Sequence, residues 1–155
     1  MALSMSAFTF GQEQGQWSFG VGHSFVNLAG TNDAEPVAAN AGYFVMDGLM
    51  LSLEFQMMTD SSDDIEDGET NWGVGARYYI GEDGLWAGMM MRNNEYYDVE
   101  EGEDVSGMDF HLAVGCSKAL GFDDKLWFEP SLGMAMPADS DAMHLGLAMG
   151  FRFTF

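Results

Sequence analysis

The last thirteen residues of the chain, 143–155, alternate strictly between large apolar side chains and small or polar ones. This period of two is typical of a β-strand with one apolar face. The opposite face is small or polar, and half of it is glycine and alanine, which favours a barrel with lipid outside and a narrow interior. The large side chains are those of Met143, Leu145, Leu147, Met149, Phe151, Phe153 and Phe155.

Seven earlier segments show the same alternation, and their connections alternate between short and long. The predicted fold is therefore all-β, an eight-stranded antiparallel up-and-down transmembrane β-barrel. An even number of strands closes the sheet, so that no strand edge is left unpaired in lipid. The predicted strands cover residues 16–27, 37–45, 49–57, 71–80, 85–93, 105–120, 125–136 and 143–155.

The terminal Phe155, with aromatic residues at alternate positions before it, resembles the last strand of bacterial outer-membrane β-barrels. With the eight alternating segments, the chain from about Gln14 onward resembles the small OmpA/OmpX-like class of barrels. The resemblance implies a location in the bacterial outer membrane, with both termini and the short turns in the periplasm. A soluble lipocalin-like barrel is the alternative, and it would need the large side chains inside.

The length of 155 residues fits a single domain, which we place at residues 14–155. Residues 1–13 are apolar and uncharged up to Gln12, and we interpret them as a residual signal-like or disordered segment. They lack the basic start and the A-x-A site of a signal peptide, so an ordered extension is the alternative. No stretch approaches the roughly 18 apolar residues of a membrane-spanning helix.

The net charge of −20, with only five Lys and Arg, excludes a nucleic-acid-binding surface. Cys116 is the only cysteine, so the chain has no internal disulfide. We expect a monomer whose partners are outer-membrane lipid and a protein that contacts the extracellular loops or the barrel wall. No resident cofactor is expected, apart from weakly bound Ca²⁺ or Mg²⁺.

Three arginines and three acids occupy positions of the predicted strands that face the interior of the barrel. An unpaired charge in a narrow lumen is costly, so the inward charges should pair with one another. The structural interpretation is a lumen that these pairs and inward aromatic side chains fill, and the alternative is an ion or proton pathway. Folding each hairpin about its loop predicts the pairs Arg77–Glu54, Arg92–Asp109 and Arg152–Glu129.

The longer predicted loops are rich in acids and contain no Lys or Arg. Such a rim either is simply solvated or gathers a hard cation, because Ca²⁺ and Mg²⁺ prefer carboxylate oxygens. Neither of the two most acidic loops has EF-hand spacing, so the predicted affinity is weak. The candidate ligands are Asp60, Asp63, Asp64, Glu66, Asp67, Glu100, Glu101, Glu103 and Asp104.

Catalytic residues are not expected. His144 lies near Ser140 and Asp141, and His111 shares a strand face with Asp109, but ordinary rim or lumen histidines explain both. The predicted function is therefore non-enzymatic: a barrel with a charge-paired lumen and acidic extracellular loops that acts as a structural, adhesion or accessory surface protein. The alternatives are a lipid-modifying outer-membrane enzyme, by acyl transfer or deacylation, and a small-solute pore.

Overall fold

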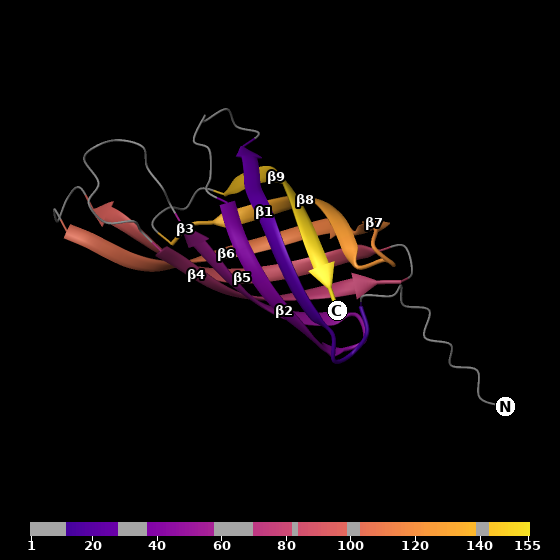
Figure 1. The fold of residues 1–155 in the computed structure, drawn as a ribbon. Helices are drawn as coiled ribbons and strands as arrows, with labels where there is room; N and C mark the ends of the chain where they lie inside the picture. The colour runs from indigo at the N-terminus through magenta and orange to yellow at the C-terminus, as the bar shows by residue number, and fades with distance from the viewer. Residues whose placement is uncertain (1–11, 28–36, 58–69, 82–83, 99–102, 139–142) are drawn as a thin grey trace.

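The computed structural model describes residues 12–27, 37–57, 70–81, 84–98, 103–138 and 143–155. These residues form strands joined by turns (Figure 1). None of them belongs to a helix that is long and apolar enough to span a membrane. The strands are β1 (Trp17–Asn27), β2 (Val37–Met46), β3 (Leu49–Met57), β4 (Thr70–Ile80), β5 (Leu85–Asp98), β6 (Glu103–Cys116), β7 (Lys118–Gly121), β8 (Leu126–Met136) and β9 (His144–Thr154).

The strands form one antiparallel sheet in which consecutive strands pair, with the exception of β6 and β7, and β1 pairs with β9. The sheet closes because β6 and β7 both pair with β8. β6 and β7 together are the predicted sixth strand, interrupted at Ser117, whose N–H instead donates to the carbonyl of Gly84 at 2.8 Å. The result is a closed eight-stranded barrel, which confirms the predicted fold.

The two faces of the barrel wall differ as the alternation predicts. Large apolar side chains on the outer face remain about half exposed, including Leu53, Phe151 and Met149. The inward positions of the same strands are buried, and Phe44 and Tyr79 have no exposed surface. An apolar exterior around a filled interior is the arrangement of a barrel in lipid. The inverse arrangement, that of a soluble lipocalin-like barrel, is not present in the described residues.

The start of β1, the C-terminus and the short turns lie at one end of the barrel, here called the terminal end. The N–H groups of Trp17 and Phe155 each donate to the other's carbonyl, at 2.9 and 3.0 Å, which fastens the first strand to the last residue. The Asp47–Gly48 turn joins β2 to β3, and Gly48 has a φ of +73°, a conformation that suits glycine. The opposite end, which carries the longer connections, is called the loop end.

β5 and β6 are longer than the sequence pattern predicts. Beyond the row where Arg92 faces Asp109, they continue to pair from Asn93–Met108 to Asp98–Glu103. The expected loop at residues 94–104 is therefore mostly a two-stranded ladder, and Glu103 belongs to a strand. Polar residues replaced the apolar alternation there, so the hydrophobic pattern gave no sign of these pairs. In Figure 1 this hairpin extends past the other strands at the loop end.

Candidate functional site

The lumen at the terminal end is packed with large side chains. Phe44, Met50, Tyr79 and Trp86 form a buried cluster, and Trp127 on β8 is also buried. Inward aromatic side chains were predicted to fill the lumen, and the burial of Phe44, Tyr79, Trp86 and Trp127 confirms this prediction. Glycine makes room for the larger rings: a Cβ on Gly115 would lie 2.5 Å from the ring of Trp86.

A folded segment at the N-terminal side covers this cluster. The side chain of Gln12 is fully buried, and the backbone carbonyl of Gln12 accepts a hydrogen bond from the N–H of Gly48 at 2.9 Å. The N–H of Gly15 donates to the carbonyl of Phe44 at 2.9 Å, and that of Phe44 donates to Gln16 at 3.0 Å. The segment is thus tied to the base of β2, and it adds to the closure of the terminal end.

Glu129 on β8 is the centre of an ion cluster above the aromatic layer. Arg152 on β9 donates from Nε to Glu129 Oε1 at 2.7 Å, and this is the pair expected from the β8–β9 hairpin. Ser117 Oγ donates to the same oxygen at 2.5 Å. Arg77, from β4 on another side of the barrel, donates to Glu129 Oε2. One buried carboxylate therefore holds two arginines and joins β4, β8 and β9.

Aromatic faces take up the positive charge that Glu129 does not balance. The guanidinium of Arg77 lies 3.9 Å from the centre of the Trp86 ring. The guanidinium of Arg152 lies 5.3 Å from the Trp127 ring and 5.4 Å from that of Tyr79. Cations are attracted to the negative faces of aromatic rings, more strongly when both are shielded from water. The aromatic layer and the ion cluster therefore stabilise each other.

A second ion pair lies nearer the loop end. Arg92 on β5 donates to Glu54 on β3, from Nε at 3.1 Å and from Nη2 at 2.5 Å. The two residues are not on neighbouring strands, because β4 runs between them. In the ladders, Gly73 of β4 faces both Glu54 and Arg92. Because Gly73 has no side chain, the ion pair can form across β4.

Arg77 pairs with Glu129, so the predicted pair of Arg77 with Glu54 is wrong. The β3–β4 register explains the difference: Arg77 faces Met50, four residues along β3 from Glu54. The Arg77–Glu129 pair also crosses the lumen, and a narrow barrel allows such contacts between strands that are not hairpin neighbours. The presence of glycine at position 73 was a sequence signal for the Arg92–Glu54 pair.

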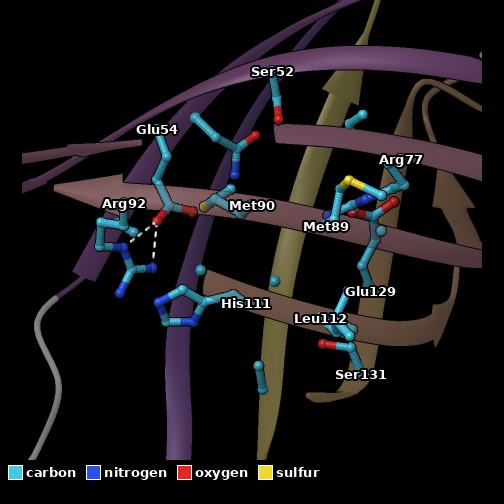
Figure 2. A pocket seen from close by; sticks show the side chains of 18 of the residues that line it. Ser52, Glu54, Arg77, Met89, Met90, Arg92, His111, Leu112, Glu129 and Ser131 are labelled. Carbon is cyan, nitrogen blue, oxygen red and sulfur yellow. Dashed lines mark hydrogen bonds and ion pairs between the residues drawn. The ribbon is translucent and has the colours of Figure 1, made fainter. Parts of the chain in front are cut away.

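Asp109 lies opposite Arg92 in the β5–β6 ladder, as predicted. Its carboxylate accepts a hydrogen bond from the N–H of Ala138 at 3.0 Å, which ties the end of β8 to β6. His111, two residues further along β6, is half-buried, and its Nε2 has no hydrogen-bond partner among the described residues. His111 and Arg92 border a cavity in the lumen between the two ion clusters (Figure 2).

The other candidate sites fall largely outside the described residues. Ser140 and Asp141 are among these, so their arrangement about His144, which is exposed, is not described. Among the residues that the structure does describe, no three His, Cys, Asp or Glu side chains gather as metal ligands would. Of the predicted cation ligands, only the backbones of Glu103 and Asp104 are described. Those outside the described residues are Asp60, Asp63, Asp64, Glu66, Asp67, Glu100 and Glu101.

Comparison with known protein structures finds the same architecture in small outer-membrane barrels. The N-terminal β-barrel domain of Pseudomonas aeruginosa OprF aligns over 93% of this chain and 100% of that one, with a TM-score of 0.61 and 16% identity. Neisserial surface protein A aligns over 90% and 96%, with a TM-score of 0.53 and 14% identity. Ail, the attachment invasion locus protein of Yersinia pestis, aligns over 92% and 99%, with a TM-score of 0.48 and 13% identity.

At these identities the similarity shows the fold alone. No model of a known protein family matches the chain, and no curated protein matches it. The chain thus has the eight-stranded architecture of the OmpA/OmpX-like outer-membrane barrels.

Proposed function

We propose that this protein is a non-enzymatic barrel of the bacterial outer membrane that acts at the cell surface through its loop end. The observation that carries the proposal is the combination of an apolar outer wall with a lumen closed by buried side chains. Because a barrel with a closed interior does not transport solutes, it must act through its outer surface and its loops. The termini would then lie in the periplasm and the loop end outside.

A pore is the less suitable function for this lumen. Phe44, Tyr79, Trp86 and Trp127 fill the cross-section at the terminal end, and the Glu129 cluster lies directly above them. An ion would have to displace aromatic side chains and then compete with buried ion pairs. In planar bilayers we expect the refolded protein to show no regular conductance steps. Reproducible single-channel steps from properly folded protein would instead favour the pore.

The projecting β5–β6 hairpin is the most distinctive element for an adhesion or accessory role. Six ladder pairs extend beyond Arg92–Asp109, a length of about 20 Å at the usual rise per residue. The described part of β4 pairs with β5 no further than Gly73–Arg92, and β8 pairs with β6 only from Met136–Phe110. The hairpin is therefore a two-stranded arm that a partner can approach.

The charge of this arm indicates the chemistry of its partner. Residues 93–108 contain six acids and no Lys or Arg. Such a segment attracts basic surfaces at a distance and repels acidic ones. We therefore expect a basic protein partner, or an anionic lipid head group bridged by a divalent cation, as the partner at the loop end.

Shortening the hairpin tests this role. Residues 94–107 are replaced by a two-residue Asn-Gly turn, which suits a hairpin, and the parent and shortened barrels are displayed on cells. Binding of an immobilised basic protein should fall at least tenfold for the shortened barrel. The matched control replaces Glu95, Asp98, Glu100, Glu101, Glu103 and Asp104 by their amides. If both variants bind as the parent does, the hairpin is not the contact surface.

A further inference from the structure

The two basic residues that lie outside the lumen flank a single turn at the terminal end. The chain has five Lys and Arg, and its three arginines form the ion pairs of the lumen. Lys118 begins β7 and Lys125 directly precedes β8, so the turn between them joins these two strands (Figure 1). The carbonyl of Lys125 accepts a hydrogen bond from the N–H of Thr154 at 2.9 Å, which holds the turn beside the end of β9.

The backbone of this turn is left-handed at three consecutive residues that are not glycine. The φ angles of Phe122, Asp123 and Asp124 are 58°, 54° and 58°. Aspartate adopts this conformation fairly readily, whereas a bulky residue such as phenylalanine seldom does. The N–H of Lys125 donates to the carbonyl of Phe122 at 3.2 Å, which closes the turn. Because phenylalanine is unfavourable for the turn itself, its presence indicates a role for this side chain outside the turn.

The turn also exposes apolar side chains at the edge of the outer wall. Of the large apolar side chains that the structure describes, Phe122 is the most exposed, at 73%, and Leu120 is exposed as well. The apolar surface continues from the turn into the wall, because Gly121 pairs with Leu126 and Leu126 pairs with Phe153. Leu120 and Phe122 therefore lie where the lipid-facing wall ends, at the level of the lipid head groups.

Four charged side chains accompany these apolar ones, two of each sign. Lys118, Asp123 and Asp124 are exposed, and Lys125 is half-buried. The described contacts include no ion pair from any of the four. The turn therefore carries no net formal charge, but it presents both ammonium and carboxylate groups at the membrane surface. A simple anion would meet the two carboxylates unfavourably, and a simple cation the two ammonium groups.

We propose that this turn binds the head group of a phospholipid with a primary ammonium, of the class of phosphatidylethanolamine. The two lysine side chains contact the phosphate, and the carboxylates of Asp123 and Asp124 accept hydrogen bonds from the lipid ammonium. The side chains of Leu120 and Phe122 pack against the glycerol and the first acyl carbons. A choline head group fits less well because its quaternary ammonium has no N–H to donate, and a glycerol head group carries no cation.

This site does not depend on the surface role proposed above, because it lies at the opposite end of the barrel from the β5–β6 arm. The proposed orientation decides only which leaflet supplies the lipid, and with the termini in the periplasm it is the periplasmic leaflet. Shortening the β5–β6 hairpin should leave the lipid preference unchanged. Loss of partner binding at the loop end and loss of head-group binding at the terminal end are thus separate outcomes.

The test is a lipid titration of the full-length ¹⁵N-labelled protein in nanodiscs, followed by backbone amide shifts of residues 118–125. The bilayer is phosphatidylcholine, into which phosphatidylethanolamine or phosphatidylglycerol is mixed in increasing proportion. Phosphatidylethanolamine should produce saturable shifts, with a midpoint about threefold lower than that of phosphatidylglycerol, because one exposed ion pair contributes about that factor. The amides of Asp47 and Gly48, in another turn at the same end, should not respond and serve as the internal control.

Removing the two carboxylates provides the second measurement. Asparagine also tolerates the left-handed backbone, so Asp123→Asn with Asp124→Asn should preserve the turn. This variant should lose the preference for phosphatidylethanolamine over phosphatidylglycerol. The matched control is Asp47→Asn, which should keep the preference, and whose side-chain oxygen can still accept the N–H of Gln14.

The lipid comparison on the unmodified protein decides the matter even if the double variant does not refold. Absence of saturable shifts with phosphatidylethanolamine, or equal midpoints for the two added lipids, would overturn the proposal. An unchanged preference in the folded double variant would overturn it as well, because the carboxylates would then not contact the lipid ammonium.

Discussion

Replacing Glu129 should be among the most destabilising single changes in the lumen. The carboxylate accepts hydrogen bonds from Ser117 at 2.5 Å and from Arg152 at 2.7 Å, and it also pairs with Arg77. Glu129→Ala leaves two arginines without their counter-charge, and Arg152 is almost completely buried. Removing one partner of a buried ion pair costs about 3–5 kcal/mol. We expect the loss for Glu129→Ala to fall in that range.

Arg152→Ala should cost less, about 3 kcal/mol, because Glu129 keeps Arg77 and Ser117 as partners. The double variant Glu129→Ala, Arg152→Ala should then lose less than the sum of the two single changes. For residues in one ion cluster the difference is about 0.5–3 kcal/mol. We expect about 2 kcal/mol here, since the double variant no longer buries Arg152 without a counter-charge.

The assay is equilibrium unfolding in urea of the protein refolded into lipid vesicles, followed by tryptophan fluorescence. A matched control combines Arg152→Ala with Glu54→Gln, which disturbs the separate Arg92 pair. That combination should be additive within about 0.5 kcal/mol. Strict additivity of the Glu129 and Arg152 changes would refute the shared cluster, and so would a cost below 1 kcal/mol for Glu129→Ala.

Three further predictions follow from packing, the lipid face and the acidic loops. Gly115→Ala should destabilise the barrel by about 1–3 kcal/mol in urea unfolding, because the added Cβ would lie 2.5 Å from the Trp86 ring. Gly150→Ala should be tolerated, because the atom nearest to its added Cβ lies at 3.5 Å. Equal effects of the two changes would contradict the tight packing of Trp86 on Gly115. Leu53→Arg on the outer wall should cost about 2–4 kcal/mol in vesicles if it lies near the midplane, whereas Phe122→Arg in an exposed turn should cost little; a harmless Leu53→Arg would argue against lipid contact. Calcium should shift amides of the acidic loops with a dissociation constant of about 10⁻⁴–10⁻³ M, and shifts matched by NaCl at equal ionic strength would leave only charge screening.

The sequence was sufficient to predict the barrel because its alternation is strict on almost every strand. At positions such as Leu51 and Ser52, apolar and polar residues separate by face, and the structure exposes the first on the outer wall. The extension of β5 and β6 was missed because acids and amides interrupt both phases of residues 94–104, so that neither phase is continuously apolar. A ladder outside the lipid needs no apolar face, so its strands leave no hydrophobic pattern.

The lumen was predictable in composition and less so in its contacts. The inward phase identified Arg77, Arg92 and Arg152 as lumen residues, and the Arg152–Glu129 contact follows from one hairpin. The partner of Arg77 did not follow, because that contact crosses the lumen from β4 to β8. Such pairs depend on the diameter of the closed barrel and on strand tilt, which the register of a single hairpin does not contain.

The central claim is that large side chains face lipid and that the lumen is closed, and the four tryptophans test it directly. Trp17 and Trp72 lie half exposed on the outer wall, whereas Trp86 and Trp127 are buried in the lumen. Two variants, Trp86→Phe with Trp127→Phe and Trp17→Phe with Trp72→Phe, are each refolded into vesicles of brominated lipid, which quenches on contact. Strong quenching is expected for the pair left on the outer wall and little for the pair left in the lumen. Equal quenching of both pairs, or stronger quenching of Trp86 and Trp127, would contradict the account.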